Sequence, residues 1–124
     1  VVAKVKEAAG RFKEPKIACL GLSYKADIDD LRESPAVEIL KKLALNKVGK
    51  ISVVEPYISK LPESLQKICY LLTDLKTAIQ NSDIIILLVN HRQFSNLYTY
   101  KLSSKIIIDL AGQYKSSNKN GGLR

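Results

Sequence analysis

The sequence has 124 residues, of which 46% are hydrophobic and 26% charged, a size and composition typical of one globular domain. No apolar run reaches the roughly 18 residues that a transmembrane helix needs, and the opening stretch, VVAKVKEAAGRFKEPK, lacks the apolar region of a signal peptide. We therefore expect a cytoplasmic protein without a transmembrane helix.

The formal net charge is +8, but most lysines are scattered singly, as on a solvated surface. The alternative interpretation is an anionic partner, either nucleic acid or a phosphorylated small molecule. A nucleic-acid-binding domain would show a basic stripe with interleaved aromatic residues or a known module, and the sequence shows neither. We expect no nucleic-acid partner.

Cys19 and Cys69 both lie in apolar runs that predict strands, so we expect buried free thiols and no metal site or redox pair. His91 is the only histidine, which excludes a His-based metal cluster. It could act as a general base at the sheet edge. A catalytic triad would also need a strand–G-x-S-x-G–helix elbow, which is absent, and we favour a structural hydrogen-bonding role.

The first half of the chain alternates helix and strand signals. Residues 1–12 show helical spacing of apolar residues, and no N-cap residue precedes Val1, so we expect the end of a longer helix in a larger protein. Residues 16–22 predict a buried strand. A helix over 35–45 follows, with Ser34 as N-cap and Pro35 at its first position. Residues 51–54 predict a second strand, ended by Glu55 and Pro56.

The second half continues this alternation. Residues 57–67 predict an irregular or weakly helical connection, 68–72 a short third strand, and 74–81 a helix capped by Thr73 or Asp74. The most apolar run, 84–89, predicts a central strand. Residues 92–100 predict a short helix or loop, and residues 105–110 a fifth strand. The polar tail over 115–124 has the composition of a disordered segment.

Five apolar strands separated by helices predict an α/β fold: a Rossmann-like three-layer sandwich with a five-stranded parallel sheet in the order 3-2-1-4-5. Ligands in such sheets bind at the carboxyl ends of the strands, where the strand order reverses. The loop over 23–34 and the Asn90–His91 turn are expected at that point, between the first and fourth strands.

The loop after the first strand differs from a dinucleotide cradle. It reads GLSYK, with one glycine where the dinucleotide fingerprint has G-x-G-x-x-G. Glu55, after the second strand, stands where a ribose-binding carboxylate would lie, although a turn before Pro56 explains it better. Ser34 could be a nucleophile, and N-capping again explains it better.

The same loop carries two cations with two open interpretations. Lys25 could reach a phosphate, and Arg32 could bind a phosphate or carboxylate with two hydrogen bonds. Alternatively both pair with the neighbouring acids and make a rigid loop; these acids are Asp27, Asp29, Asp30 and Glu33. A magnesium site at Asp29 and Asp30 has no further carboxylate in register, and we expect no metal.

The stretch GLSYKADIDDLRESPA resembles the signature of the C-terminal, UDP-binding domain of the nucleotide-sugar 6-dehydrogenase family. The motifs VVEP, SDIIILLVNHRQF and IIIDLAG also resemble this family, and DDLRESPA is most similar to its UDP-N-acetyl-D-mannosamine dehydrogenase branch. The resemblance covers about residues 16–114.

This resemblance implies a function for a longer protein. Such enzymes oxidise the sugar C6 alcohol to a carboxylate in two NAD-dependent steps, with NAD bound mainly by an N-terminal domain. A central helix links the two domains and makes the dimer. Residues 1–14 would then be the end of that helix, 15–114 the UDP-sugar-binding domain and 115–124 a disordered tail. The product would be used for surface polysaccharide, and this chain alone is predicted to be inactive.

The resemblance also implies residue roles. Tyr24 and Lys25 match the pair that contacts the nucleotide-sugar, and Arg32 matches the arginine that reaches the NAD side. Asp30, Glu33 and Ser34 would orient Arg32 and close the loop. No catalytic residue is implied in this chain, because both cysteines lie outside the family's nucleophile motif. The arginine expected after the fifth strand is replaced by AGQYK, where Lys115 is the nearest cation.

One rival hypothesis is a free-standing nucleotide-binding regulatory module without dehydrogenase activity. The helix without an N-cap at residue 1 argues against it. An upstream G-x-G-x-x-G half and a Gly-Cys motif would decide between the two hypotheses.

Overall fold

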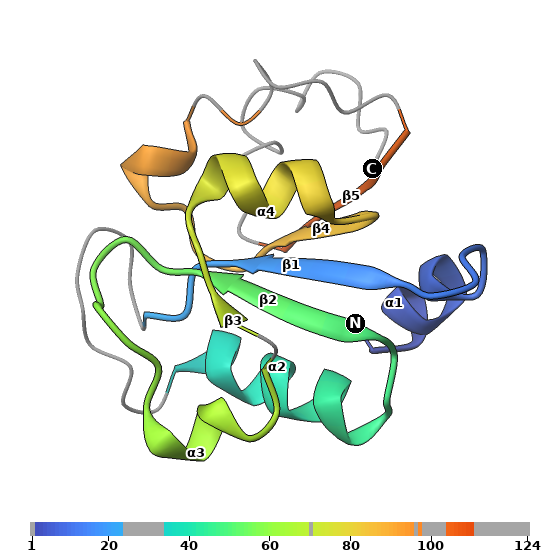
Figure 1. Cartoon of the computed structure of the whole chain (residues 1–124), viewed down its shortest axis with the longest axis horizontal. Coiled ribbons are helices and arrows are strands. Elements are labelled where there is room, and N and C mark those ends of the chain that lie inside the picture. Colours follow the sequence, from blue (N-terminus) through green and yellow to red (C-terminus); the bar gives the residue numbers. More distant parts are fainter. Residues whose placement is uncertain (1, 24–33, 70, 96, 98–103, 111–124) are drawn as a thin grey trace.

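The computed structural model of the chain describes residues 2–23, 34–69, 71–95, 97 and 104–110. Five strands form one parallel sheet in the order β3-β2-β1-β4-β5 (Figure 1). They are β1 (Lys16–Leu20), β2 (Lys50–Val54), β3 (Leu71–Leu72), β4 (Ile84–Leu87) and β5 (Ile106–Asp109). The predicted fold and strand order are confirmed.

Helices cover both faces of the sheet. They are α1 (Val2–Ala9), α2 (Pro35–Leu45), α3 (Glu63–Gln66) and α4 (Leu75–Asn81), with a short 3₁₀ helix, η1 (Arg92–Phe94). Helices α2 and α3 lie on one side of the sheet and α4 on the other (Figure 1). Apolar residues of α1 join the same buried cluster as those of α2 and α3, so α1 belongs to the α2 side.

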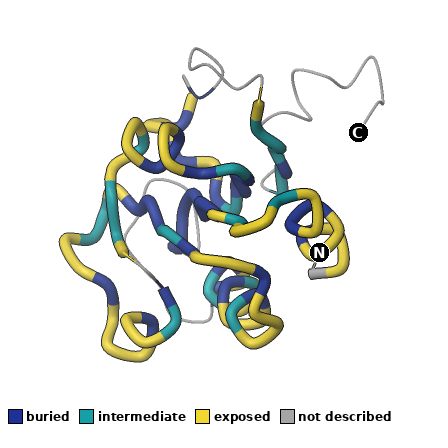
Figure 2. Tube along the Cα trace, turned by 45° about the vertical axis from the view of Figure 1, so that its right-hand side comes forward, coloured by how far each residue is buried: buried dark blue, intermediate teal, exposed yellow. Residues whose placement is uncertain are grey.

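The strands supply the core because their side chains alternate between the two faces. Ile17 and Cys19 of β1 join the cluster on the α2 side, whereas Ala18 and Leu20 join the cluster on the α4 side. All four positions are buried, as expected for a strand with a parallel neighbour on each side. Buried stretches therefore follow the inner strands, while turns and outer helix faces are exposed (Figure 2).

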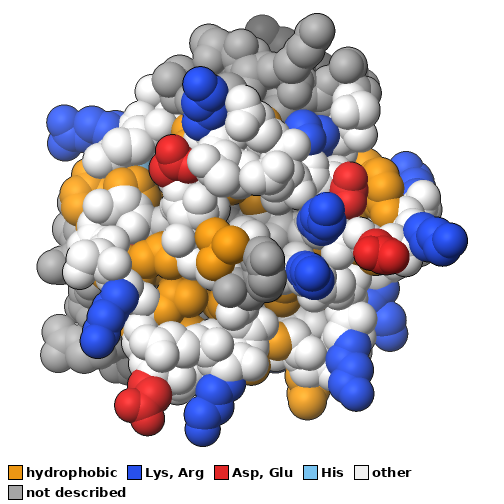
Figure 3. Space-filling model, viewed as in Figure 1, with side chains coloured by type: hydrophobic (Ala, Val, Ile, Leu, Met, Phe, Trp, Pro, Cys, Tyr) orange, Lys and Arg blue, Asp and Glu red, His pale blue; other side chains and the backbone are white. Residues whose placement is uncertain are grey.

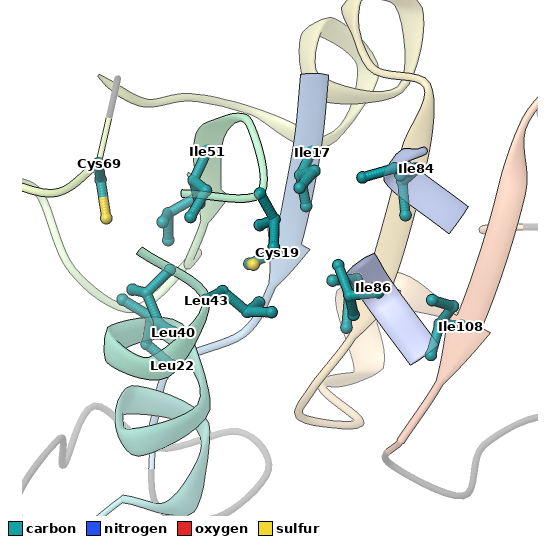
Figure 4. Close-up of a cluster of buried hydrophobic side chains, with 14 of the residues drawn as sticks. Ile17, Cys19, Leu22, Leu40, Leu43, Ile51, Cys69, Ile84, Ile86 and Ile108 are labelled. Atoms are coloured by element: carbon teal, nitrogen blue, oxygen red, sulfur yellow. The ribbon is translucent and has the colours of Figure 1, made fainter. Parts of the chain in front are cut away.

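The larger cluster gathers aliphatic side chains from β1, β2, β4, β5 and α2 (Figure 4). Cys19 lies among them, and Cys69 lies at the margin of the group (Figure 4). Both thiols are free and buried, as predicted.

Several predicted elements are shorter than expected: β1 ends at Leu20, β4 at Leu87 and β5 at Asp109, each one or two residues early, and the third strand and first helix differ more. The third strand spans Leu71–Leu72, which pair with Ser52 and Val53 of β2. Cys69 therefore precedes the strand and was wrongly placed in it; its amide donates to the Leu65 carbonyl and belongs to the turn after α3. The first helix ends at Ala9, after which the amides of Arg11 and Phe12 bond three residues back.

Lysines and arginines are spread around the face in Figure 3, with acidic and neutral side chains between them. This distribution resembles a solvated surface more than a nucleic-acid stripe. Among the described residues, no helix is both long and apolar enough to span a membrane.

Candidate functional site at the carboxyl edge of the sheet

Three polar residues meet where β1, β2 and β4 end. The register pairs Leu20 with both Val54 and Leu87, so the three strands reach the same edge together. Ser23, Glu55 and His91 follow within a few residues, and all three are buried. We call these three residues the edge cluster.

Gly21 allows this close meeting. Its φ of +95° lies in a region that side-chain-bearing residues rarely adopt. A Cβ atom at this position would lie 2.6 Å from Cβ of Val89, which follows β4. The chain after β1 can therefore pass directly against the chain after β4 only because residue 21 is glycine.

Glu55 accepts hydrogen bonds from three backbone amides in two different loops. Its Oε1 lies 2.8 Å from Leu22 N and 3.0 Å from Ser23 N, and its Oε2 lies 3.1 Å from Tyr57 N. Oε1 also lies 2.9 Å from His91 Nε2. One buried carboxylate thus joins the segments that follow β1, β2 and β4.

His91 is enclosed by rings as well as by polar groups. Its ring centroid lies 4.9 Å from that of Tyr57 and 5.5 Å from that of Phe94, and its side chain is 0% exposed. A carboxylate oxygen can only accept, so the contact with Glu55 requires a hydrogen atom on Nε2 and makes His91 the donor. These contacts match the expected structural role.

The edge cluster resembles a Ser-His-Glu triad in composition but not in geometry. Ser23 Oγ lies 3.2 Å from His91 Nε2, the same nitrogen that contacts Glu55. In a catalytic triad the acid and the nucleophile contact opposite ring nitrogens, which lets the histidine pass a proton between them. The arrangement here provides no such relay, and Ser23 is only 1% exposed.

Ser34, which follows the 24–33 segment, also contacts the carboxyl edge of the sheet. Its Oγ donates to the Leu22 carbonyl at 2.6 Å, with the Ser23 carbonyl 3.2 Å away, and accepts from the Ala36 and Val37 amides. It is therefore the predicted N-cap of α2, and Pro35 occupies the first helical position. The two residues that flank the 24–33 segment are in contact with each other.

The turn after β1 does not fit a dinucleotide phosphate. In a dinucleotide cradle, backbone amides at this turn point at the pyrophosphate. Here the amides of Leu22 and Ser23 already bond to the Glu55 carboxylate, which would repel a phosphate. Glu55 is also 3% exposed, so it offers nothing to a ribose. The ribose interpretation of Glu55 is wrong.

A hollow of about 390 Å³ opens beside the edge cluster on the α4 side. Its polar lining includes Glu55, Asp74 and Gln93. Asp74 caps α4 through the Thr77 amide, and hydrogen bonds from Thr77 hold its pKa below the ordinary value. Negative charge at this rim disfavours a diphosphate there.

Neither cysteine lies in an environment that lowers the pKa of its thiol and makes it reactive. Burial raises the pKa of the Cys69 thiol from 9.0 to about 11. Burial, with a smaller contribution from Cys69, raises the pKa of Cys19 further. The reactive thiolate is disfavoured at both positions. Among the described residues, no group of three or more His, Cys, Asp or Glu side chains could hold a metal ion.

The site residues predicted from the sequence fall into two sets. Ser34 lies within the described part of the chain, at the carboxyl edge, and its role in orienting Arg32 stays a prediction. The others lie outside the described residues: Tyr24, Lys25, Asp30, Arg32 and Glu33. The sequence indicates roles for Glu55 and His91 singly and does not reveal their contact. The sequence does carry a signal for this contact: a polar residue follows each of the three strands that end at this edge of the sheet.

Residues 18–116 match the UDP-binding domain of the UDP-glucose/GDP-mannose dehydrogenase family. The chain belongs to this family. An NDP-N-acetyl-D-galactosaminuronic acid dehydrogenase of Ralstonia nicotianae is 48% identical over 94% of the chain and 27% of the relative. A UDP-N-acetyl-D-mannosamine dehydrogenase of Campylobacter jejuni is 46% identical over 84% of the chain and 26% of the relative.

Solved structures agree with this membership. The GDP-mannose dehydrogenase of Pseudomonas aeruginosa, in a ternary complex, superposes with a TM-score of 0.71 at 27% identity, over 90% of this chain and 28% of that one. A UDP-glucose dehydrogenase of Pyrobaculum islandicum gives 0.70 at 22% identity, over 87% of this chain and 24% of that one, which shows the fold alone. The chain spans about a quarter of the length of the relatives it matches.

Proposed function

We propose that this chain is the UDP-sugar-binding domain of an NAD-dependent nucleotide-sugar 6-dehydrogenase. The observation that carries the proposal is the family match over residues 18–116. The names of two relatives at 46–48% identity suggest an N-acetylhexosamine or its uronic acid as the sugar. Our preferred substrate is UDP-N-acetyl-D-mannosamine, oxidised in the cytoplasm to the uronate for surface polysaccharide.

In this proposal, Tyr24 and Lys25 bind the nucleotide-sugar and Arg32 faces the cofactor. Their place in the chain supports these roles. Lys25 follows Ser23 closely, and Arg32 shortly precedes Ser34; Ser23 and Ser34 are both held at the carboxyl edge. Parallel sheets bind ligands at that edge, next to the reversal of strand order. Lys25 would supply a point charge for the diphosphate, and Arg32 a planar fork of donors.

NAD would be held mainly by another part of the protein. The turn after β1 supports this proposal, because its amides are occupied by Glu55 and do not form a dinucleotide cradle. The cofactor would accept the hydride, while this chain binds and orients the UDP-sugar. Residues 1–14 would belong to a longer helix that links the domains and forms a dimer. Residues 15–114 would form the binding domain, and residues 115–124 a disordered tail.

Calorimetric titration of the full-length protein tests the binding role. We expect UDP-N-acetyl-D-mannosamine to bind, and Lys25→Ala to raise its Kd at least about tenfold, since a hydrogen bond to a charged group contributes about 1.5–3 kcal/mol. Lys41→Ala removes an exposed lysine of α2 and serves as the matched control. Equal affinity of Lys25→Ala and wild type would refute the role of Lys25, and titration of UDP-N-acetyl-D-galactosamine alongside would compare the two sugars.

An NADH-forming assay tests the dehydrogenase role. We expect the full-length protein to reduce NAD with its UDP-sugar and the 124-residue chain alone to give no turnover. A full-length protein that binds UDP-sugar but never forms NADH would favour the regulatory module instead.

A further inference from the structure

We propose that Glu55, held in place by His91, is a positioning residue for nucleotide-sugar binding. This inference rests on the proposed function and extends it to residues that contact no ligand themselves. The Glu55 carboxylate fixes the backbone at Leu22 and Ser23. Those two residues set the point and direction in which the chain leaves β1 toward Tyr24 and Lys25.

The chain leaving β1 is fixed from several sides. Gly21 N donates to the Val54 carbonyl at 2.8 Å, which continues the pairing of β1 with β2 by one residue. Beyond it, the Leu22 and Ser23 amides bond to Glu55, and their carbonyls lie at 2.6 and 3.2 Å from Ser34 Oγ. Among these partners, Glu55 is the charged acceptor that contacts both amides.

The position requires a carboxylate and not merely a polar side chain. Two oxygens accept from three backbone amides and from His91. A glutamine has one oxygen and one NH₂ group. The NH₂ group is a donor and cannot accept, so at least one of these donors would lose its partner. Hydrogen bonds to an ionised acceptor are roughly twice as strong as neutral ones, and burial strengthens them further.

His91 sets the orientation of the carboxylate. Its ring lies close to Tyr57 and Phe94, and its Nε2 points at Glu55 Oε1. The Tyr57 amide binds the second carboxylate oxygen, so Tyr57 contacts both members of the pair. A ring without a donor at position 91 would keep much of this packing and lose the bond to Glu55.

The test is calorimetric titration of UDP into the full-length protein without NAD. The variants are Glu55→Gln, His91→Phe and the matched control Glu63→Gln, which makes the same chemical change at an exposed position of α3. We expect Glu55→Gln to raise the Kd at least about tenfold with the number of sites unchanged, since a displaced Lys25 would lose its contact with the diphosphate and a hydrogen bond to a charged group contributes about 1.5–3 kcal/mol. His91→Phe should shift the Kd in the same direction by less, and the control should bind like wild type.

Stoichiometry separates positioning from a purely structural role. Partial unfolding would reduce the number of binding sites and leave the Kd of the remaining sites unchanged. That result, or an unchanged Kd at full stoichiometry, would overturn the inference. If Glu55→Gln does not yield folded protein, the Kd and the number of binding sites measured for His91→Phe test the inference in its place. Failure of the wild-type protein to bind UDP would instead overturn the proposed function, and this inference with it.

Discussion

Ser34 Oγ lies 2.6 Å from the Leu22 carbonyl oxygen, across 12 positions of the sequence. One hydroxyl therefore caps α2 and fastens the start of α2 to the end of β1. The contact holds together the two parts of the chain that flank residues 24–33. It also combines a local role, which the sequence shows, with a tertiary role, which it does not.

Replacing Ser34 with alanine should destabilise the fold. The variant loses an N-cap, which contributes about 1 kcal/mol, and leaves the buried Leu22 carbonyl without this donor, which costs about 1–3 kcal/mol. We expect Ser34→Ala to lower the free energy of unfolding by about 2–4 kcal/mol, measured by urea denaturation. Ser64→Ala, at an exposed position of α3, should change it by less than about 0.5 kcal/mol. Equal effects would contradict the tertiary role of Ser34.

Gly21→Ala should be among the most destabilising single-methyl additions in the described chain. The φ of +95° disfavours any side chain, and the added Cβ would lie 2.6 Å from Val89 Cβ. Strain and overpacking together predict a loss of about 3 kcal/mol in the free energy of unfolding. Gly10→Ala is the control, because its Cβ would meet no atom closer than 3.4 Å. A small effect at Gly21 would show that the chain after β1 can move away from β4.

The native thiols should react slowly with a disulfide reagent. The rise in the Cys69 pKa from 9.0 to about 11 lowers its thiolate fraction about 100-fold near pH 8. A thiolate of higher pKa is also more nucleophilic, which offsets about tenfold of this loss. We therefore expect reaction with Ellman's reagent at pH 8 to be at least about tenfold slower than for an exposed thiol, and Cys19 to react more slowly than Cys69. Both should react promptly in denaturant. A thiol that reacts rapidly in the folded protein would contradict this environment.

Capping of α4 by Asp74 should make stability depend on pH. The lowered pKa of Asp74 arises from hydrogen bonds with the side chain and backbone of Thr77, so the folded state favours the ionised form. This stabilisation is complete above the pKa of the unfolded chain and is lost as pH falls through the lower folded pKa. The urea midpoint of wild type relative to Asp74→Asn should therefore decline on acidification below about pH 4. A difference that stays constant with pH would contradict the titration.

The regular elements could be predicted from the sequence because their signals are local. The apolar runs predicted the strands, and right-handed crossovers predicted the order β3-β2-β1-β4-β5 that the structure has. Ser34 and Pro35 predicted the start of α2, which spans Pro35–Leu45. The third strand was predicted too long because the start of its apolar run belongs to the turn after α3, where the Cys69 amide bonds to the Leu65 carbonyl. An apolar run does not reveal which of its residues pair with a neighbouring strand.

The sequence by itself determined the family, the fold and the edge of the sheet at which to look. From the sequence, Glu55 could be a ribose ligand or part of a turn, and His91 could be a general base or a structural residue. Only the tertiary structure decided both, by placing Glu55 Oε1 and His91 Nε2 2.9 Å apart across 36 positions. The physical reason is that a carboxylate's role depends on which donors surround it. Here those donors come from segments that follow three different strands, which meet only when the sheet is assembled.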